Sequence, residues 1–364
     1  MKKRTFIQMP VLCMTMAMAA PFFTGCKDDD DPTEELIAPS EYIYVLNSGN
    51  SGSNNTSLSM YNADDGTVTK DIFEVRNGRR LGDTGQDMIV YGSKIYISVY
   101  GESTIEVTDL EAKSIKQIKT EGQPRYFAVY GGKVYVTYFN GYVARIDTAS
   151  LTVEAKVQTG RNPEQLTAAN GKLYVANSGG LDYNTAAGYD RTVSVIDTAT
   201  FTETKKIEVV VNPCNMVSDR QGYVYVVSMG NYGDIPSTLQ KIDSRTDEVS
   251  VMEDLNGSFL AILENTLYTV HSRYDDAWNQ IAGFYSYDVV NRKLLSDNFI
   301  GTTEIAKPYQ INTDGIFGYL YIMTSDYLND GDVYVFDSTE KFVTKFEVGL
   351  NPMKALRVVT IKSE

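Results

Sequence analysis

The chain has 364 residues, a formal net charge of −14 at pH 7 and a single histidine. The surplus of carboxylates repels a phosphate backbone, which argues against nucleic acid as a partner. One histidine cannot build a histidine cluster, which argues against an imidazole-based triad or a zinc site.

The N-terminus has the form of a signal peptide. Three basic residues (2–4) precede an uncharged apolar run (6–23), and small residues follow it up to Cys26. A run of about 18 residues is also long enough to span a bilayer, so a retained membrane anchor is the alternative. Two prolines interrupt the run and favour the signal peptide. We therefore expect a signal peptide over residues 1–25.

The stretch FFTGCKDDDD (22–31) resembles a bacterial lipoprotein signal, in which the cysteine becomes the lipidated first residue of the mature protein. Phe23 departs from that pattern, because a smaller aliphatic residue is usual there. The resemblance implies acyl chains on Cys26 and a lipidated tether over residues 26–40, which would hold a soluble domain on a membrane. The mature chain would have a formal charge of −17, because the signal peptide carries three basic residues and no acidic one.

A lysine and four aspartates follow Cys26 directly. Like charges repel one another, so one reading of this block is a solvated, extended tether. The block also resembles the short Lys-plus-acidic signal by which lipoproteins of Bacteroidota reach the outer face of the outer membrane. That resemblance implies a protein of the outer membrane that is lipid-anchored and faces the cell exterior.

Cysteine usage agrees with a lipoprotein. Cys13 lies in the signal peptide and Cys26 would be acylated, so Cys214 would have no partner for an intramolecular disulfide. No later apolar run approaches the length of a membrane span. Residues 41–364 therefore form the expected globular domain.

A short apolar strand with a central tyrosine recurs seven times along this domain. The segments are YIYVLNSG, KIYISVYG, KVYVTYFN, KLYVANSGG, YVYVVSMG, TLYTVHSR and YLYIMTSD, and their tyrosines are Tyr44, Tyr96, Tyr135, Tyr174, Tyr225, Tyr268 and Tyr321. Successive tyrosines are 39 to 53 residues apart. Self-similarity at this spacing indicates a repeat architecture.

Two further elements accompany each tyrosine strand. An alternating strand follows it, as in ARIDTASL and SVIDTATF, and ends in Asp or Asn, whose side chains close tight turns. A proline junction then separates most units, as in RNPEQ, VNPCN and LNPMK, and no window shows sustained helical periodicity. Seven units of about four strands predict an all-β, seven-bladed β-propeller. The repeats of a β-helix are shorter, and a pair of sandwiches would not repeat seven times.

The two ends of the domain predict how the ring closes. The chain enters at Tyr42 with a strand that is second in the other units, whereas NPMKALRVVTI resembles the strand that precedes it. Residues 353–361 are therefore expected to form the innermost strand of the first blade. Without this C-terminal strand the ring would have an open edge.

Propeller topology predicts that one face carries the functional loops. The connections between blades and the loops between second and third strands open on the same face. Long loops without a secondary-structure pattern are typical of functional sites, and the opposite face has short turns. The long loops carry aromatic residues, which offer a broad flat area with a polar tip. The alternative is that a tyrosine-rich β-protein places some tyrosines in loops without a function.

The predicted ligand-binding residues on this face are Asn47, Tyr100, Arg125, Tyr126, Tyr138, Phe139, Asn177, Tyr183, Tyr232, His271, Tyr274, Trp278, Tyr309 and Tyr327. The starts of the inner strands add Gln86, Asp87, Glu164, Gln165, Asn215, Phe259, Gln310 and Lys354 to the same face. His271 is either a metal ligand of a bound cofactor or a loop residue without that role.

The repeats KLYVANSGG and TVSVIDTAT, with the NP junctions, resemble the YncE-like family of bacterial propellers over roughly residues 41–361. Together with FFTGCKDDDD, the chain resembles the surface propeller lipoproteins of gut Bacteroidota. Their BtuG-type members capture cobalamin (vitamin B12) and pass it to a TonB-dependent outer-membrane transporter. The resemblance implies a corrinoid-binding loop face, a transporter partner and no required cofactor, with cobalamin as the bound ligand. No binding residue of that family can be matched individually to a position in this chain.

Two other classes of function stay open. A glycan-binding or adhesive surface propeller would leave the same repeats, because a fold does not decide a function. An enzyme is not expected. Propeller lyases and lactonases place carboxylates or histidines around the mouth, where Asp87 and Glu164 are the only obvious acids, and quinone-dependent propellers carry repeated tryptophans, whereas this chain has Trp278 alone.

Overall fold

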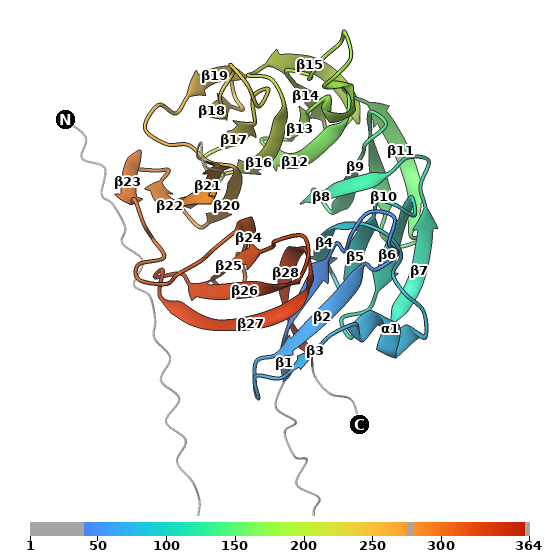
Figure 1. Cartoon of the computed structure of the whole chain (residues 1–364). Coiled ribbons are helices and arrows are strands. Elements are labelled where there is room, and N and C mark those ends of the chain that lie inside the picture. The colour runs from blue at the N-terminus through green and yellow to red at the C-terminus, as the bar shows by residue number, and fades with distance from the viewer. Residues whose placement is uncertain (1–39, 275–279, 361–364) are drawn as a thin grey trace, which may run out of the picture. The chain divides into compact units, whose positions relative to one another are not determined.

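Seven antiparallel sheets of four strands each surround a central axis (Figure 1). The structure, a computed structural model, describes residues 40–274 and 280–360, which belong to the unit formed by residues 38–364. The prediction of an all-β, seven-bladed propeller is confirmed.

The strands run from the centre outward in each blade. Blade 1 is β28 (Pro352–Thr360), β1 (Ser40–Asn47), β2 (Ser57–Asn62) and β3 (Val68–Thr69); blade 2 is β4 (Gly85–Tyr91), β5 (Lys94–Val99), β6 (Thr104–Thr108) and β7 (Ser114–Lys119); blade 3 is β8 (Pro124–Tyr130), β9 (Lys133–Tyr138), β10 (Tyr142–Asp147) and β11 (Thr152–Gln158). Blade 4 is β12 (Pro163–Ala169), β13 (Lys172–Asn177), β14 (Thr192–Asp197) and β15 (Thr202–Glu208); blade 5 is β16 (Pro213–Ser218), β17 (Tyr223–Ser228), β18 (Thr238–Asp243) and β19 (Glu248–Val251). Blade 6 is β20 (Phe259–Leu263), β21 (Thr266–Tyr274), β22 (Gln280–Asp288) and β23 (Lys293–Ser296); blade 7 is β24 (Pro308–Asp314), β25 (Tyr319–Thr324), β26 (Asp330–Asp337) and β27 (Phe342–Leu350).

The ring closes inside blade 1. Strand β28 pairs antiparallel with β1, with Thr360 opposite Ser40 and Pro352 opposite Asn47. The two ends of the described chain thus share one sheet (Figure 1). The predicted closing strand, residues 353–361, is confirmed to within one residue, and it pairs the edge of β1 that would otherwise be exposed.

The seven repeated tyrosines are core residues. Each lies in the second strand of its blade and is at most 2 % exposed. The adjacent blades cover both faces of this strand, which explains why the repeat reads as an almost continuous apolar run. The repeat therefore predicts the fold and supplies no ligand-binding group.

Apolar clusters join each blade to the next. Among the described residues there are seven such buried clusters, one at each interface between adjacent blades. The cluster that joins the first and last blades packs Ile43 and Val45 of β1 against Tyr321 and Met323 of β25. Each blade buries its faces only by packing on its neighbours, so the blades fold as one ring.

Helix α1 (Ile72–Asn77) lies in the connection between blades 1 and 2, where no helix was predicted. It has only six residues, too few to show a helical period, and it buries Ile72 and Phe73 beside blade 1. A 3-10 turn, η1 (Gly180–Asp182), lies in a loop of blade 4. Among residues 40–274 and 280–360, no helix has the length and apolar character needed to cross a membrane.

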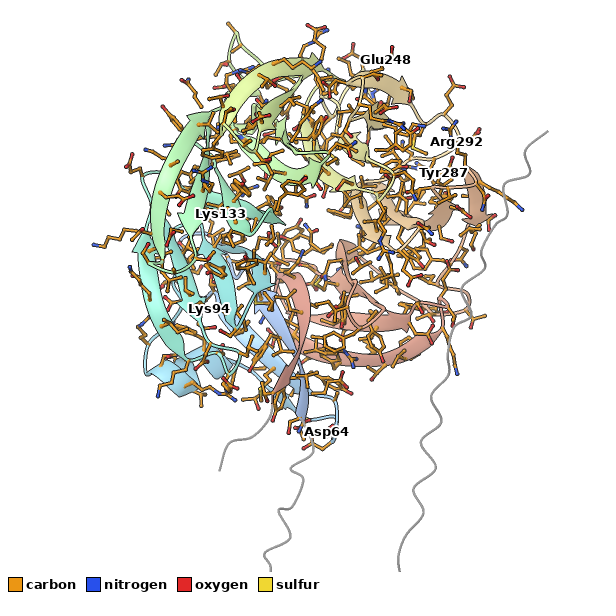
Figure 2. The ribbon with its side chains drawn as sticks, turned by 180° about the vertical axis from the view of Figure 1, so that it is seen from behind. Asp64, Lys94, Lys133, Glu248, Tyr287 and Arg292 are labelled. Atoms are coloured by element: carbon orange, nitrogen blue, oxygen red, sulfur yellow. The ribbon has the colours of Figure 1, made fainter. Side chains whose placement is uncertain are left out.

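The two faces of the ring differ as expected. The loop face carries the connections between blades and the loops between second and third strands, among them residues 48–56, 178–191 and 229–237. The opposite, hairpin face has short turns, such as the one before Lys94 and the one before Lys133, which Figure 2 labels. Long loops therefore gather on a single face.

The buried tyrosines give a test of which hydroxyls stabilise the ring. The Tyr225 hydroxyl donates to the buried Asp219 carboxylate at 2.9 Å, whereas the Tyr96 hydroxyl has no hydrogen-bond partner among the described residues. We predict that Tyr225→Phe lowers the free energy of unfolding by about 1–2 kcal/mol, because a charged acceptor loses a donor. Tyr96→Phe is the matched control and should change it by less than about 0.5 kcal/mol. Urea unfolding measures both, and equal losses would contradict this assignment.

Candidate functional site

Asparagine–proline junctions position the inner strands and the loops. Asn162, Asn212 and Asn351 adopt left-handed backbone angles, with φ of 46°, 63° and 56°, and a proline that begins an inner strand follows each one. Asparagine tolerates this region better than most residues, so it can turn the chain from an outer strand to the next inner strand. These junctions bring the start of each inner strand to the loop face, near the central axis.

Two of these asparagines also form hydrogen bonds with the loops. Asn351 Nδ2 donates to the Gly49 carbonyl at 2.9 Å, and Asn162 Nδ2 donates to the Phe139 carbonyl at 3.0 Å. Asn162 Oδ1 also accepts the Leu181 N–H at 3.1 Å. The loop face is therefore tied at several points to the ring that carries it.

A nearly buried ion pair occupies the start of β8 and β12. Arg125 Nε donates to Glu164 Oε2 at 3.0 Å, and Arg125 Nη2 donates to the same oxygen. Arg125 Nη1 donates to Gln86 Oε1 at 2.8 Å, and Gln86 Nε2 in turn donates to the Tyr126 hydroxyl at 2.8 Å. The Arg125 and Glu164 side chains are only 17 % and 12 % exposed. The arginine is thus neutralised and offers little net charge to a ligand.

Three aromatic rings surround the Arg125 guanidinium. Its Cζ lies 4.8 Å from the Phe139 ring centroid, 5.4 Å from that of Tyr100 and 5.6 Å from that of Tyr126. Tyr100 and Phe139 also meet edge to face at 5.8 Å. Such contacts hold a cation by the ring quadrupole. Four of the predicted residues therefore do converge, as a rigid cluster at the inner side of the loop face.

An open cavity of about 400 Å³ lies beside this cluster, and we call it the mouth cavity. Its walls include Arg125 and Tyr126 of blade 3 and Tyr309 and Tyr327 of blade 7. Residues 48–51, in a loop of blade 1, also line the cavity. The Tyr309 and Tyr327 rings meet edge to face at 5.4 Å. The volume falls in the range of about 300–1,000 Å³ that is typical of ligand pockets.

A second group of tyrosines lies on the loops of blades 4 and 5. The rings of Tyr183 and Tyr189 stack at 6.3 Å, and Tyr189 meets Tyr232 edge to face at 6.2 Å. Tyr183 and Tyr232 remain 62 % and 72 % exposed, and Tyr274 at the end of β21 is 57 % exposed. Large exposed rings on one face are typical of a binding surface.

Three predicted ligand residues are wrong, because their side chains are buried. Asn47 and Asn177 are both 0 % exposed and donate to hydroxyls of the neighbouring strand, Asn47 to Ser59 Oγ at 2.9 Å and Asn177 to Ser194 Oγ at 2.9 Å. Tyr138 is 1 % exposed inside the cluster between blades 2 and 3. These residues end second strands and stabilise the blades, so no ligand on the loop face can reach them.

The other candidates considered are His271, which the structure describes, and Cys26 and Trp278, which it does not. His271 lies within β21, its Nδ1 atom is buried without a hydrogen-bond partner among the described residues, and burial lowers the pKa of its ring. Within residues 40–274 and 280–360, no group of three or more His, Cys, Asp or Glu side chains could hold a metal. Cys26, the expected lipidation site, and Trp278 lie outside the described residues.

Sequence reasoning missed some of the residues that line the mouth cavity. Thr84 and Met353 line it. The junction LNPMK was the available signal for Met353, because this residue directly follows the proline that begins β28.

A family model describes residues 41–309 of this chain, most of its length. The chain belongs to the DUF5074 family. That family is described only as a domain of unknown function. No curated protein matches the chain.

Several solved structures share the fold of this DUF5074 protein. A putative 6-phosphogluconolactonase from Bacteroides fragilis aligns with a TM-score of 0.60 at 12% identity, over 90% of this chain and 100% of the other. A quinonprotein alcohol dehydrogenase-like protein from Bacteroides thetaiotaomicron aligns with a TM-score of 0.59 at 17% identity, over 86% and 77%. The hydrazine synthase of Kuenenia stuttgartiensis aligns with a TM-score of 0.57 at 17% identity, over 72% and 85%. At these identities the likeness is one of fold alone.

The ion pair in the mouth of this DUF5074 domain gives a pH-dependent prediction. Burial raises the pKa of the Glu164 carboxyl, and Arg125 opposes that rise. Arg125→Met leaves the carboxylate without its partner, so we predict a loss of about 3–5 kcal/mol in unfolding free energy at pH 7.5. A carboxyl with a raised folded-state pKa stabilises the fold in its protonated form, and this contribution is lost as pH rises. The loss should therefore be smaller at pH 5.

Urea unfolding at the two pH values measures this effect. The double variant Arg125→Met/Glu164→Gln is the matched control, because it removes both charges and should restore much of the stability at pH 7.5. An equal loss at both pH values, or no recovery in the double variant, would contradict a buried, mutually compensating pair.

Proposed function

We propose that this protein is a cell-surface lipoprotein that captures cobalamin or a related corrinoid on its loop face and delivers it to a TonB-dependent outer-membrane transporter. The observation that carries the proposal is the mouth cavity, with aromatic walls and a neutralised arginine at the centre of one loop-rich face. The resemblance to BtuG-type propeller lipoproteins supplies the identity of the ligand, and the binding role rests on the geometry.

The charge balance of the mouth favours a neutral ligand. A free arginine would attract a carboxylate or phosphate, but Glu164 already accepts from Arg125. The remaining polar side chains are uncharged amides, phenols and hydroxyls, such as those of Gln310, Tyr309 and Ser51. Corrinoids carry several uncharged amide arms around a large flat ring, so amide donors and acceptors beside aromatic rings suit them.

The arrangement also favours tight binding without chemistry. Arg125 and its three aromatic neighbours are packed and hydrogen-bonded before any ligand arrives. A pre-formed site loses little conformational entropy on binding, which favours affinity. We therefore propose a binding protein and not an enzyme.

Calorimetric titration of residues 33–364 with cyanocobalamin tests the ligand. We predict stoichiometric binding that Tyr327→Ala and Tyr232→Ala each weaken by about tenfold, since truncation of an aromatic anchor costs on the order of 1–2 kcal/mol. Phe317→Ala is the matched control, because this half-exposed ring lies on the turn between β24 and β25 on the hairpin face.

The outcomes separate the two classes of binder. Absence of heat and of retained red colour would overturn the corrinoid proposal, and a glycan array would then test the alternative ligand class. Binding that Phe317→Ala weakens as much as Tyr327→Ala does would place the ligand on the wrong face and contradict the mouth cavity as the site.

The proposed location has its own test. In intact cells that carry the full chain, we predict that added protease degrades the propeller, because acylation at Cys26 and the acidic block export it to the outer surface. A variant in which Asp28, Asp29, Asp30 and Asp31 are replaced by alanine should stay anchored but protected. A wild-type protein that resists protease until the cells are lysed would contradict the exposed location.

A further inference from the structure

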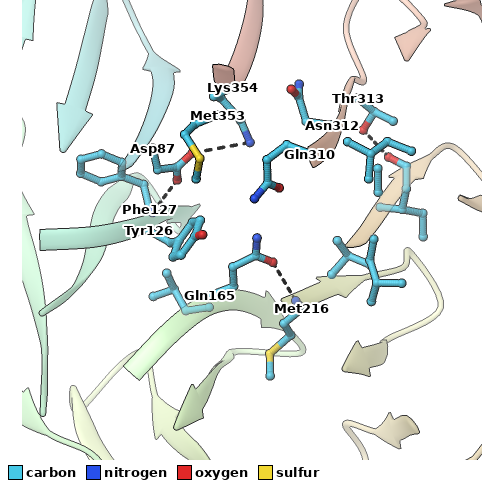
Figure 3. Close-up of a pocket in the computed structure, with 16 residues that line it drawn as sticks. Asp87, Tyr126, Phe127, Gln165, Met216, Gln310, Asn312, Thr313, Met353 and Lys354 are labelled. Carbon is cyan, nitrogen blue, oxygen red and sulfur yellow. Dashed lines mark hydrogen bonds and ion pairs between the residues drawn. The ribbon is translucent and has the colours of Figure 1, made fainter. Parts of the chain in front are cut away.

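A smaller cavity of about 160 Å³ lies on the propeller axis, and we call it the channel cavity (Figure 3). Its walls come from the inner strands of all seven blades. Tyr126, Gln310 and Met353 line both the channel cavity and the mouth cavity, so the one continues into the other. The space holds only a few water volumes of roughly 30 Å³ each, enough for a side arm and too little for a ring system.

Two glutamines project into this cavity from opposite sides (Figure 3). Gln165 Oε1 accepts the Met216 N–H at 2.7 Å, which fixes the side chain and leaves its NH2 group for a ligand. Gln310 makes no side-chain hydrogen bond to any residue that the structure describes, so its amide offers one acceptor and two donors. Unmet hydrogen-bonding groups on the wall of a cavity are typical of a polar binding site.

A charged pair completes the wall. Lys354 Nζ lies 3.7 Å from Asp87 Oδ1, close enough for an ion pair but beyond hydrogen-bond distance. Asp87 Oδ2 accepts the Phe127 N–H at 2.8 Å. The pair has no net charge, and it adds donors at the lysine and an acceptor at the aspartate to those of the glutamines.

We propose that the channel cavity is a subsite for one primary carboxamide arm of a ligand whose body lies in the mouth cavity. The inference rests on the proposed function and names the group that enters the channel. A carboxamide has one acceptor and two donors, which complement the Lys354 and Gln165 donors and the Gln310 and Asp87 acceptors. A carboxylate has no donor to offer these acceptors and would lie against the Asp87 carboxylate, so the cavity discriminates against it.

Titration of the wild-type protein and two leucine variants with cyanocobalamin tests the subsite. We expect Gln310→Leu to weaken binding by about tenfold or more, because it removes hydrogen bonds from an enclosed polar group. Gln158→Leu is the matched control, since Gln158 is exposed on the outer strand β11, and it should bind as the wild type does.

A second set of probes identifies the group that enters. These are derivatives of cyanocobalamin in which a single peripheral amide is hydrolysed to a carboxylate. One derivative should bind the wild type about tenfold or more weakly than the others do, and Gln310→Leu should reduce that difference. Equal binding of all derivatives, or full affinity in Gln310→Leu, would overturn the subsite and leave the proposed function standing. Absence of any binding by the wild type would overturn both.

Discussion

The pairing of β28 with β1 is the contact on which the rest of the structure depends. It joins chain segments that are 305 to 320 residues apart, with Tyr44 opposite Leu356 and Ala355 opposite Val45. Among the described residues, an apolar cluster fills each interface between adjacent blades. The two clusters that flank blade 1 form only because β28 completes that blade. Closure thus pairs the edge of β1 that would otherwise be exposed and completes the ring of blades that carries the loops.

Ring closure also explains why a binding site can form on one face. The junction asparagines turn the chain at the loop face, and their amides bind the loops of the same or the neighbouring blade. Arg125 from β8 and Glu164 from β12 belong to different blades, as do Tyr126 and Tyr309. No single blade contains the mouth, so the site exists only where inner strands converge.

The neutralised arginine decides which ligands suit this mouth. An acidic protein with an unpaired arginine at its centre would select anions, whereas the Arg125–Glu164 pair leaves aromatic surface and amides as the recognition elements. The same balance recurs in the channel, where Lys354 lies beside Asp87. Two internally compensated charge pairs, one beside the mouth cavity and one on the wall of the channel cavity, favour a large uncharged ligand with polar arms.

The sequence predicts the fold well because the repeated apolar segments correspond to the buried second strand of each blade. The repeated tyrosines and the proline junctions identify seven units, and the second-strand position of Tyr42 predicts closure. The site is predicted less well. Tyr100, Arg125, Tyr126 and Phe139 follow the expected topology, but Asn47, Asn177 and Tyr138 end strands that are buried on both faces, so alternation gives no sign of which side they face.

The sequence also does not predict which side chains from different blades form pairs. Nothing in the spacing of Arg125 and Glu164, or of Asp87 and Lys354, indicates that these side chains would meet, because each pair comes from separate repeats brought together only at the axis. The loop conformations depend on hydrogen bonds to junction asparagines that are distant in the sequence, which no local pattern records.

Hydrogen exchange with and without cyanocobalamin tests the central claim most directly, because it reports on both faces of the intact ring in one measurement. The account predicts slower exchange on binding in the loop-face segments 48–56, 229–237 and 325–329, with the hairpin-face turn at 315–318 unchanged. Protection confined to the hairpin face, or exchange that cyanocobalamin leaves unaltered everywhere, would contradict a corrinoid site on the loop face.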